Sequence, residues 1–122
     1  MLEHYNGVIR IRALKNDLYE EEDIDSLLKG CIKLNNGEPV RILMDMIEHD
    51  IVLSNSAKAY FFNAELAKEM VIGEAVVIKS TVGSVMFDIL LRASRPSHPM
   101  RSFTDIEKAH RWLIGLPDKQ TK

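Results

Sequence analysis

The sequence predicts an α/β domain in which a mixed sheet of about five strands is packed by four helices, in the order ββαβαβαβα. Two observations support this class. Short apolar runs typical of strands alternate with segments whose apolar residues repeat at helical spacing. The chain also starts with two strand-like runs around Asn6-Gly7, the residue pair that tight hairpin turns prefer. Strands that alternate with helices pair in parallel, and the hairpin makes the sheet mixed.

The first half of the chain contains the hairpin, one helix and one buried strand. Apolar and polar residues alternate from residue 8 to residue 14, which predicts a strand with one buried face. A cluster of carboxylates then precedes an apolar stripe at helical spacing that includes Ile24, Leu28 and Cys31. Carboxylates favour the positive N-terminal end of a helix. Residues 40–46 are expected to form a buried strand, and residues 47–55 a polar loop.

The second half predicts three more helices and two more strands. A helix is expected from Ser56 to Met70, and Gly73 is expected to break the pattern before a strand at residues 75–78. A brief strand at residues 100–103 precedes the last helix. The third helix opens at Gly83-Ser84, and its apolar stripe consists of Val82, Val85, Met86, Ile89 and Leu90. We expect all four helices to shield the sheet with such stripes.

Composition narrows the class of protein. The 122 residues suit one domain, expected over residues 1–117 with a polar tail at 118–122, and 46% of them are apolar. A net charge of -2 argues against nucleic-acid binding and against a polybasic membrane anchor. No signal-peptide pattern is present, and no apolar run approaches the roughly 20 residues that span a bilayer. The single Cys31 permits neither an internal disulfide nor a multi-cysteine zinc site, so a cytoplasmic location is expected.

Two stretches of the chain carry a family resemblance. The strand and helix start at residues 40–45 and 53–57, and the strand and helix at 100–105 and 109–113, resemble those of the STAS family of SpoIIAA-like anti-sigma-factor antagonists. The order of elements is similar over nearly the whole chain. The resemblance implies a non-enzymatic regulatory or protein-interaction domain. It also implies a protein partner, for example a regulatory kinase-like protein.

The resemblance further implies a phosphorylatable serine at the start of the second helix. The second serine of the family's Asp-Ser-Ser-Gly motif aligns with Ser56, but Ser54, Asn55 and Ala57 stand at the other three positions. The resemblance therefore supports the fold more than a kinase-controlled switch. We take Ser56, Ser54 and Asn55 as candidate phosphorylation or interaction residues.

A candidate ligand site follows from the expected topology. Ligands of open α/β sheets bind beyond the carboxyl ends of parallel strands, where helix N-termini attract anions. Two loops would meet there and supply candidate ligand or anion contacts, namely Asp45, His49, Lys79, Ser80, Thr81 and Ser84. The simpler interpretation is that Ser54, Ser56 or Ser84 only caps its helix.

Other chemistry has weaker support in the sequence. Glu48-His49-Asp50 offers metal-ligand types, but the spacing matches no known motif, and an exposed polar loop is the preferred interpretation. We expect no metal and no cofactor. Cys31 lies in an apolar stripe and is interpreted as a buried small hydrophobe. Without a phosphate loop or nucleophile motif, an enzyme is the least favoured function. The alternative to a protein-interaction domain is a binding module for a lipid, nucleotide or other anion. A homodimer is compatible with either.

Overall fold

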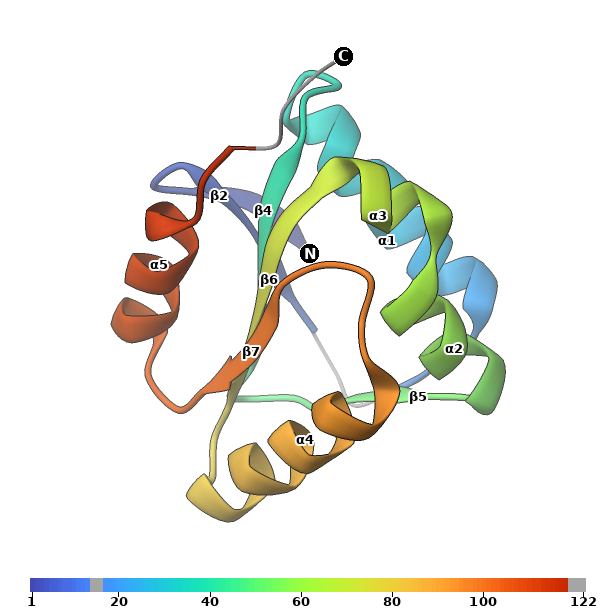
Figure 1. Cartoon of the computed structure of the whole chain (residues 1–122), viewed down its shortest axis with the longest axis vertical. Helices are drawn as coiled ribbons and strands as arrows, with labels where there is room; N and C mark the ends of the chain where they lie inside the picture. The colour runs from blue at the N-terminus through green and yellow to red at the C-terminus, as the bar shows by residue number, and fades with distance from the viewer. Residues whose placement is uncertain (14–16, 119–122) are drawn as a thin grey trace.

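The computed structural model describes residues 1–13 and 17–118, and its centre is a mixed five-stranded sheet in the order β1-β2-β4-β6-β7 (Figure 1). β1 pairs antiparallel with β2, and the other neighbours pair in parallel. The predicted fold class is therefore confirmed. The strands are β1 (Leu2–Tyr5), β2 (Val8–Arg12), β4 (Val40–Met46), β6 (Val71–Ile78) and β7 (Met100–Phe103). A small parallel pair, β3 (Asp17–Tyr19) with β5 (Ile51–Leu53), lies apart from this sheet.

The helices cover both faces of the main sheet. They are α1 (Glu21–Leu34), α2 (Asn55–Asn63), α3 (Glu65–Met70), α4 (Thr81–Ser94) and α5 (Ile106–Gly115). Figure 1 shows α5 on one face and α1, α2 and α3 on the other, with α4 at the lower end of the sheet. The sheet therefore has a hydrophobic core on each of its two faces. Leu43 of β4 packs with Leu113 of α5, whereas Ile42 of the same strand packs in the larger cluster beneath α1 and α2. Each fully buried aliphatic side chain contributes about 1.5–3 kcal/mol.

The N-terminal hairpin turns as its sequence predicts. Asn6 and Gly7 have φ values of 47° and 87°, the left-handed region that a type I′ turn requires at both positions. Asn and Gly tolerate this region because one can bond locally and the other has no Cβ. The turn sets the register in which Tyr5 lies opposite Val8.

Three local predictions are wrong. The segment expected to be a polar loop at 47–55 contains β5, because Ile51 is buried and β3 offers a parallel partner. The strand expected at residues 75–78 begins at Val71, so Gly73 lies inside β6 and not between the helix and the strand. The expected helix from Ser56 to Met70 is divided into α2 and α3 at Ala64, whose ψ of 133° is extended. The predicted alternation of helices and strands survives all three changes.

The orientation of α4 is the main departure from the sequence prediction. Its apolar stripe does not shield the sheet: Val82, Met86 and Ile89 are 69%, 65% and 61% exposed. The residues of α4 that are buried are Ser84 and Leu91. The prediction of a helix is correct, but the side of the helix that faces the protein is the more polar one and not the predicted apolar stripe.

The last described residues are held by β4. Arg41 donates from Nε to the carbonyl of Leu113 at 2.8 Å and from a terminal nitrogen to the carbonyl of Leu116 at 2.7 Å. The same guanidinium lies 2.9 Å from Asp118, a residue expected in the tail. The rest of the expected tail, residues 119–122, and Leu14 of the expected second strand lie outside the described residues. Within residues 1–13 and 17–118, no helix combines the length and the apolar character that crossing a membrane requires.

Candidate functional site

The two loops that the sequence analysis placed together do lie side by side. The ends of β4 and β6 are paired, with Met46 opposite Ile78. The segments after these strands line one open depression. Of the predicted contact residues, Lys79 and Ser80 line it, together with Glu48 and Asp50 of the other loop. Parallel pairing alone produces this meeting, since both chains leave the sheet at the same edge.

Asp45, a predicted ligand contact, is instead buried and paired within the protein. It is 4% exposed, and its carboxylate pairs with Arg10 of the neighbouring strand, with Nε 3.1 Å from Oδ2. Its other oxygen accepts a hydrogen bond from the backbone N–H of Ile47 at 3.0 Å. Both oxygens are therefore engaged within the protein, and the pair ties β2 to β4.

The predicted serines fall into three environments. Ser54 and Ser80 are the N-caps of α2 and α4 and accept hydrogen bonds from Ala57 N and Gly83 N. The capping interpretation is confirmed for Ser54, whereas α4 begins two residues before the expected Gly83 and is capped by Ser80 and not by Ser84. Ser56 is exposed in the first turn of α2, with its hydroxyl 3.3 Å from that of Ser54. Ser84 is buried beneath α4 and does not face the depression.

The remaining candidate residues lie at the starts of α2 and α4 and in the loop after β4. Asn55 and Thr81 are the exposed first residues of α2 and α4, and His49 is half-buried in the loop after β4. The structure brings Lys79 and Ser80 to the depression but carries Ser56 away along β5. No group of three or more histidine, cysteine or carboxylate side chains suited to a metal occurs among the described residues.

Helix α4 presents the most unusual surface. We use the term α4 face for its five exposed apolar residues, Val82, Val85, Met86, Ile89 and Leu90. The opposite side is anchored by polar contacts: the Ser102 hydroxyl of β7 lies 2.7 Å from both the Ser84 hydroxyl and an Asp88 carboxylate oxygen. These contacts fix the rotation of the helix. Exposed apolar patches on folded domains are candidates for interaction surfaces.

An apolar cavity of about 160 Å³ lies between α2 and α4, with β5 at its edge. Phe61 and Phe62 of α2 and Phe87 and Leu90 of α4 contribute to its walls. Among the described residues that line it, Lys58 of α2 is the one that carries a charge. The α4 face and the first turns of α2 therefore border the same opening.

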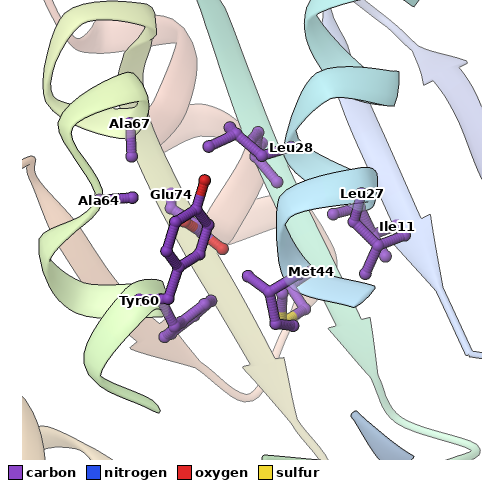
Figure 2. A pocket seen from close by; sticks show the side chains of 11 residues that line it. Ile11, Leu27, Leu28, Met44, Tyr60, Ala64, Ala67 and Glu74 are labelled. Atoms are coloured by element: carbon purple, nitrogen blue, oxygen red, sulfur yellow. The ribbon is translucent and has the colours of Figure 1, made fainter. Parts of the chain in front are cut away.

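A second, smaller cavity of about 30 Å³ lies between α1 and α2, above the sheet (Figure 2). Glu74 of β6 reaches it from below, and Tyr60 lies at its edge. The carboxylate is 5% exposed, and its Oε1 lies 3.1 Å from Nε2 of the fully buried His98. The Tyr60 hydroxyl donates a hydrogen bond to Asp25 of α1. About one water molecule would fill this space.

The contacts around this smaller cavity shift two pKa values. The hydrogen bond to Asp25, followed by burial, raises the pKa of Tyr60 to about 12. The hydrogen bond from Lys29, followed by that from Tyr60, lowers the pKa of Asp25. Both shifts favour the arrangement in which a neutral phenol donates to a charged carboxylate. The contact therefore joins α1 to α2 over a wide pH range.

Sequence reasoning missed the Glu74–His98 pair. One signal for Glu74 was available, because it is the single charged residue between Val71 and Ile78. The expected break at Gly73 hid that signal by placing Glu74 outside the strand. His98 had no such signal, since its burial depends on the loop between α4 and β7 packing against β6.

This architecture is the SpoIIAA-like fold, and a known crystal structure with that fold resembles it. The crystal structure of an uncharacterized DUF3478-family protein with that fold, from Shewanella loihica PV-4, superposes with a TM-score of 0.59. The match covers 93% of this chain and 90% of the other at 16% sequence identity, so it concerns the fold. The chain itself belongs to the family described as a domain of unknown function, DUF7793, whose model matches residues 1–116. No curated protein matches the sequence.

Proposed function

We propose that this chain is a non-enzymatic protein-interaction domain that docks a partner protein through the α4 face and the adjoining first turn of α2. One observation carries the proposal: α4 directs five of its large apolar side chains to solvent, whereas Ser84 and Asp88 contact Ser102 of β7 and Leu91 is buried in the core. Exposing several large aliphatic side chains side by side is unfavourable in water. Such a patch becomes favourable when a partner covers it.

The environments of the predicted site residues support an interaction role over catalysis. Both carboxylate oxygens of Asp45 accept hydrogen bonds, one from Arg10 and the other from the backbone N–H of Ile47. The hydroxyls of Ser54 and Ser80 cap helices, and that of Ser84 is buried against Ser102. A general base or nucleophile must instead face a space that a substrate can enter.

Ser56 is the proposed regulatory position of this surface. It lies exposed in the same helical turn as Lys58, which lines the cavity between α2 and α4. A phosphate on Ser56 would be stabilised by the helix N-terminus and would add negative charge beside the docking surface. We propose that this charge weakens docking, as the resemblance to the STAS family suggests. Ser56→Asp should reduce the affinity for the partner.

A photo-crosslinking amino acid at Met86 tests the docking surface in cells that produce the protein. A matched probe replaces Glu107, which is exposed on α5. We expect a protein adduct at position 86 and not at position 107. The cross-linked protein is then purified and its affinity for the chain measured, and Met86→Glu should weaken binding at least about tenfold, or 1.4 kcal/mol. Equal labelling at both positions, or unchanged affinity, would contradict the proposal.

The cavity of about 160 Å³ favours a second candidate function, binding of a small ligand. Its walls are apolar, with Lys58 at one side, which suits a small apolar molecule that carries an anionic group. Native mass spectrometry of the purified protein would detect such a ligand as added mass. Phe87→Trp should fill part of the cavity and remove that mass. A clean protein mass from several expression hosts would argue against this candidate.

A further inference from the structure

We infer that the smaller cavity, between α1 and α2, binds the ammonium head of a small alkylamine, with Glu74 of β6 as the carboxylate that receives it. The inference goes beyond the docking function, since none of the residues of the α4 face lines this cavity. Three observations support it: a buried carboxylate with one oxygen unpaired, apolar and aromatic walls, and a volume suited to an ammonium group.

Glu74 lies on the face of β6 that packs against α1 and α2. Side chains alternate along a strand, so Glu74 shares this face with Val76, whereas Ala75 belongs to the cluster beneath α5. In the parallel register, Glu74 lies beside Ile42 of β4, which also lines the cavity. Figure 2 shows the Glu74 side chain reaching the cavity from the sheet. The strand thereby places a carboxylate among apolar side chains.

One oxygen of the Glu74 carboxylate has a partner within the protein and the other does not. Oε1 lies 3.1 Å from Nε2 of His98, and Nδ1 of the same ring lies 3.3 Å from the Ser97 hydroxyl. A neutral imidazole satisfies both contacts, by donating from Nε2 and accepting at Nδ1. Among the described residues, none donates a hydrogen bond to Oε2 of Glu74.

The unpaired oxygen of Glu74 is open to the cavity. No fully buried polar side-chain atom of residues 1–13 and 17–118 lacks a partner, so Oε2 keeps some accessible surface. The cavity that Glu74 lines provides it. A carboxylate on a residue that is 5% exposed requires further donors, because burial removes the water that would otherwise solvate its charge. A ligand that enters the cavity with N–H groups meets this requirement.

The walls of the cavity favour an organic cation. Glu74 is the one charged residue among the described residues that line it, and the rest of the walls are apolar side chains and the rings of Tyr60 and Phe61. Aromatic rings attract ammonium groups, whereas a hard metal ion requires several oxygen ligands. Asp25, which accepts from the Tyr60 hydroxyl, is already paired with Lys29 at 2.8 Å. Glu74 is therefore the available carboxylate.

The volume of the cavity sets the size of the group that it holds. About 30 Å³ accommodates one water-sized group, and an ammonium group is about as large as a water molecule. Ala64 and Ala67 line the cavity and leave room that longer side chains would fill. Leu27 and Tyr60 are the half-buried residues of the described lining, so the alkyl chain would leave between α1 and α2. The site therefore suits a primary amine on a short, unbranched chain.

Titration of the full chain with n-butylammonium chloride, followed by amide chemical shifts in NMR spectra, tests the inference. We expect saturable shifts centred on Ala64, Ala67 and Glu74, with a dissociation constant of about 1 mM. n-Butanol, which has the same chain and a neutral head, should bind at least about tenfold more weakly. Equal affinity for the two compounds, or no saturation up to about 100 mM amine, would overturn the inference.

Two substitutions locate the bound amine. Glu74→Gln keeps the shape of the side chain and removes its charge, so it should weaken butylammonium binding at least about tenfold. Glu65→Gln is the matched control, because Glu65 is exposed on α3, and it should leave the affinity unchanged. Ala67→Leu should fill the cavity and abolish the saturable shifts.

Circular dichroism checks that each variant is folded. Unchanged affinity for butylammonium in folded Glu74→Gln or folded Ala67→Leu would place the amine elsewhere and overturn the inference. If Glu74→Gln does not fold, the comparison with n-butanol on the unaltered chain and the Ala67→Leu variant decide the outcome.

Discussion

The hydroxyl of Ser84 on α4 lies 2.7 Å from the hydroxyl of Ser102 on β7, in the interior of the protein. The Ser102 hydroxyl also lies 2.7 Å from an oxygen of Asp88, one helical turn further along α4. Buried polar groups require partners, so these three side chains must face one another. Their mutual contact turns the apolar side of the same helix outward.

Ser102→Ala should loosen α4. The substitution removes the hydroxyl that both Ser84 and Asp88 contact, and leaves a partly buried carboxylate with one partner fewer. We expect the free energy of unfolding to fall by about 2 kcal/mol. Urea denaturation measures this loss, and amide exchange should quicken in α4 before other helices. Thr104→Ala, at an exposed position just after β7, is the control and should change stability by less than about 0.5 kcal/mol.

Removing the partner of Glu74 should cost more. His98→Ala leaves a buried carboxylate without the ring nitrogen that lies 3.1 Å from it. Leaving a buried polar group without its partner costs about 1–3 kcal/mol, and deletion of the buried imidazole ring adds the loss of its packing. Thermal or urea unfolding measures the loss, with His4→Ala at an exposed position as control.

The double variant Glu74→Leu with His98→Leu distinguishes the cost of an unsatisfied buried polar group from the loss of packing. Replacing both members of a buried pair by apolar residues is often close to neutral. We therefore expect the double variant to be more stable than His98→Ala. A double variant as unstable as the single one would show that packing, and not the loss of the polar contact, dominates at this position.

The contact between Tyr60 and Asp25 predicts a pH dependence at both ends of the scale. The Tyr60 pKa rises from 10.0 to about 12, so the contact stabilises the fold below pH 10 and this contribution is lost as the pH climbs toward 12. The Asp25 pKa falls below its ordinary 3.8, so its contribution is present above that pH and lost under stronger acid. Ultraviolet titration of the phenolate, taken as the difference between wild type and Tyr60→Phe, should show the late-titrating group.

Asp25→Asn should move the Tyr60 pKa back toward 10.0, because it removes the negative charge of the carboxylate to which the phenol donates its hydrogen bond. Lys29→Ala should raise the Asp25 pKa, since the hydrogen bond from Lys29 is the largest cause of its depression. A Tyr60 titration that Asp25→Asn leaves unchanged would contradict the contact.

Cys31 should be inert in the folded protein. It has no exposed surface, and burial, followed by the nearby Glu74 charge, raises its pKa to about 12. The thiolate is the reactive form, so at pH 8 a thiol reagent should label the native protein only as fast as it opens. Addition of denaturant should bring complete labelling. Rapid labelling without denaturant would contradict the buried position.

The sequence by itself determined the class of fold and the local devices that build it. Asn6-Gly7 fixed the hairpin because few other residues accept its backbone conformation. The apolar run at β4 fixed a buried strand, and Ser54 marked a helix start because serine caps free backbone amides. Alternation of these elements then fixed parallel pairing and the meeting of two loops at one sheet edge.

Only the tertiary structure decided the environment of each side chain. The helical spacing of Val82, Met86 and Ile89 specifies one apolar side of α4 but not which side faces the protein. The buried contacts of Ser84 and Asp88 with Ser102, which is 18 residues from Ser84 along the chain, settle that rotation. The pairing of Asp45 with Arg10 and of Glu74 with His98 likewise joins distant segments. Periodicity reports the repeat of a single element, whereas burial depends on which elements the whole chain brings against it.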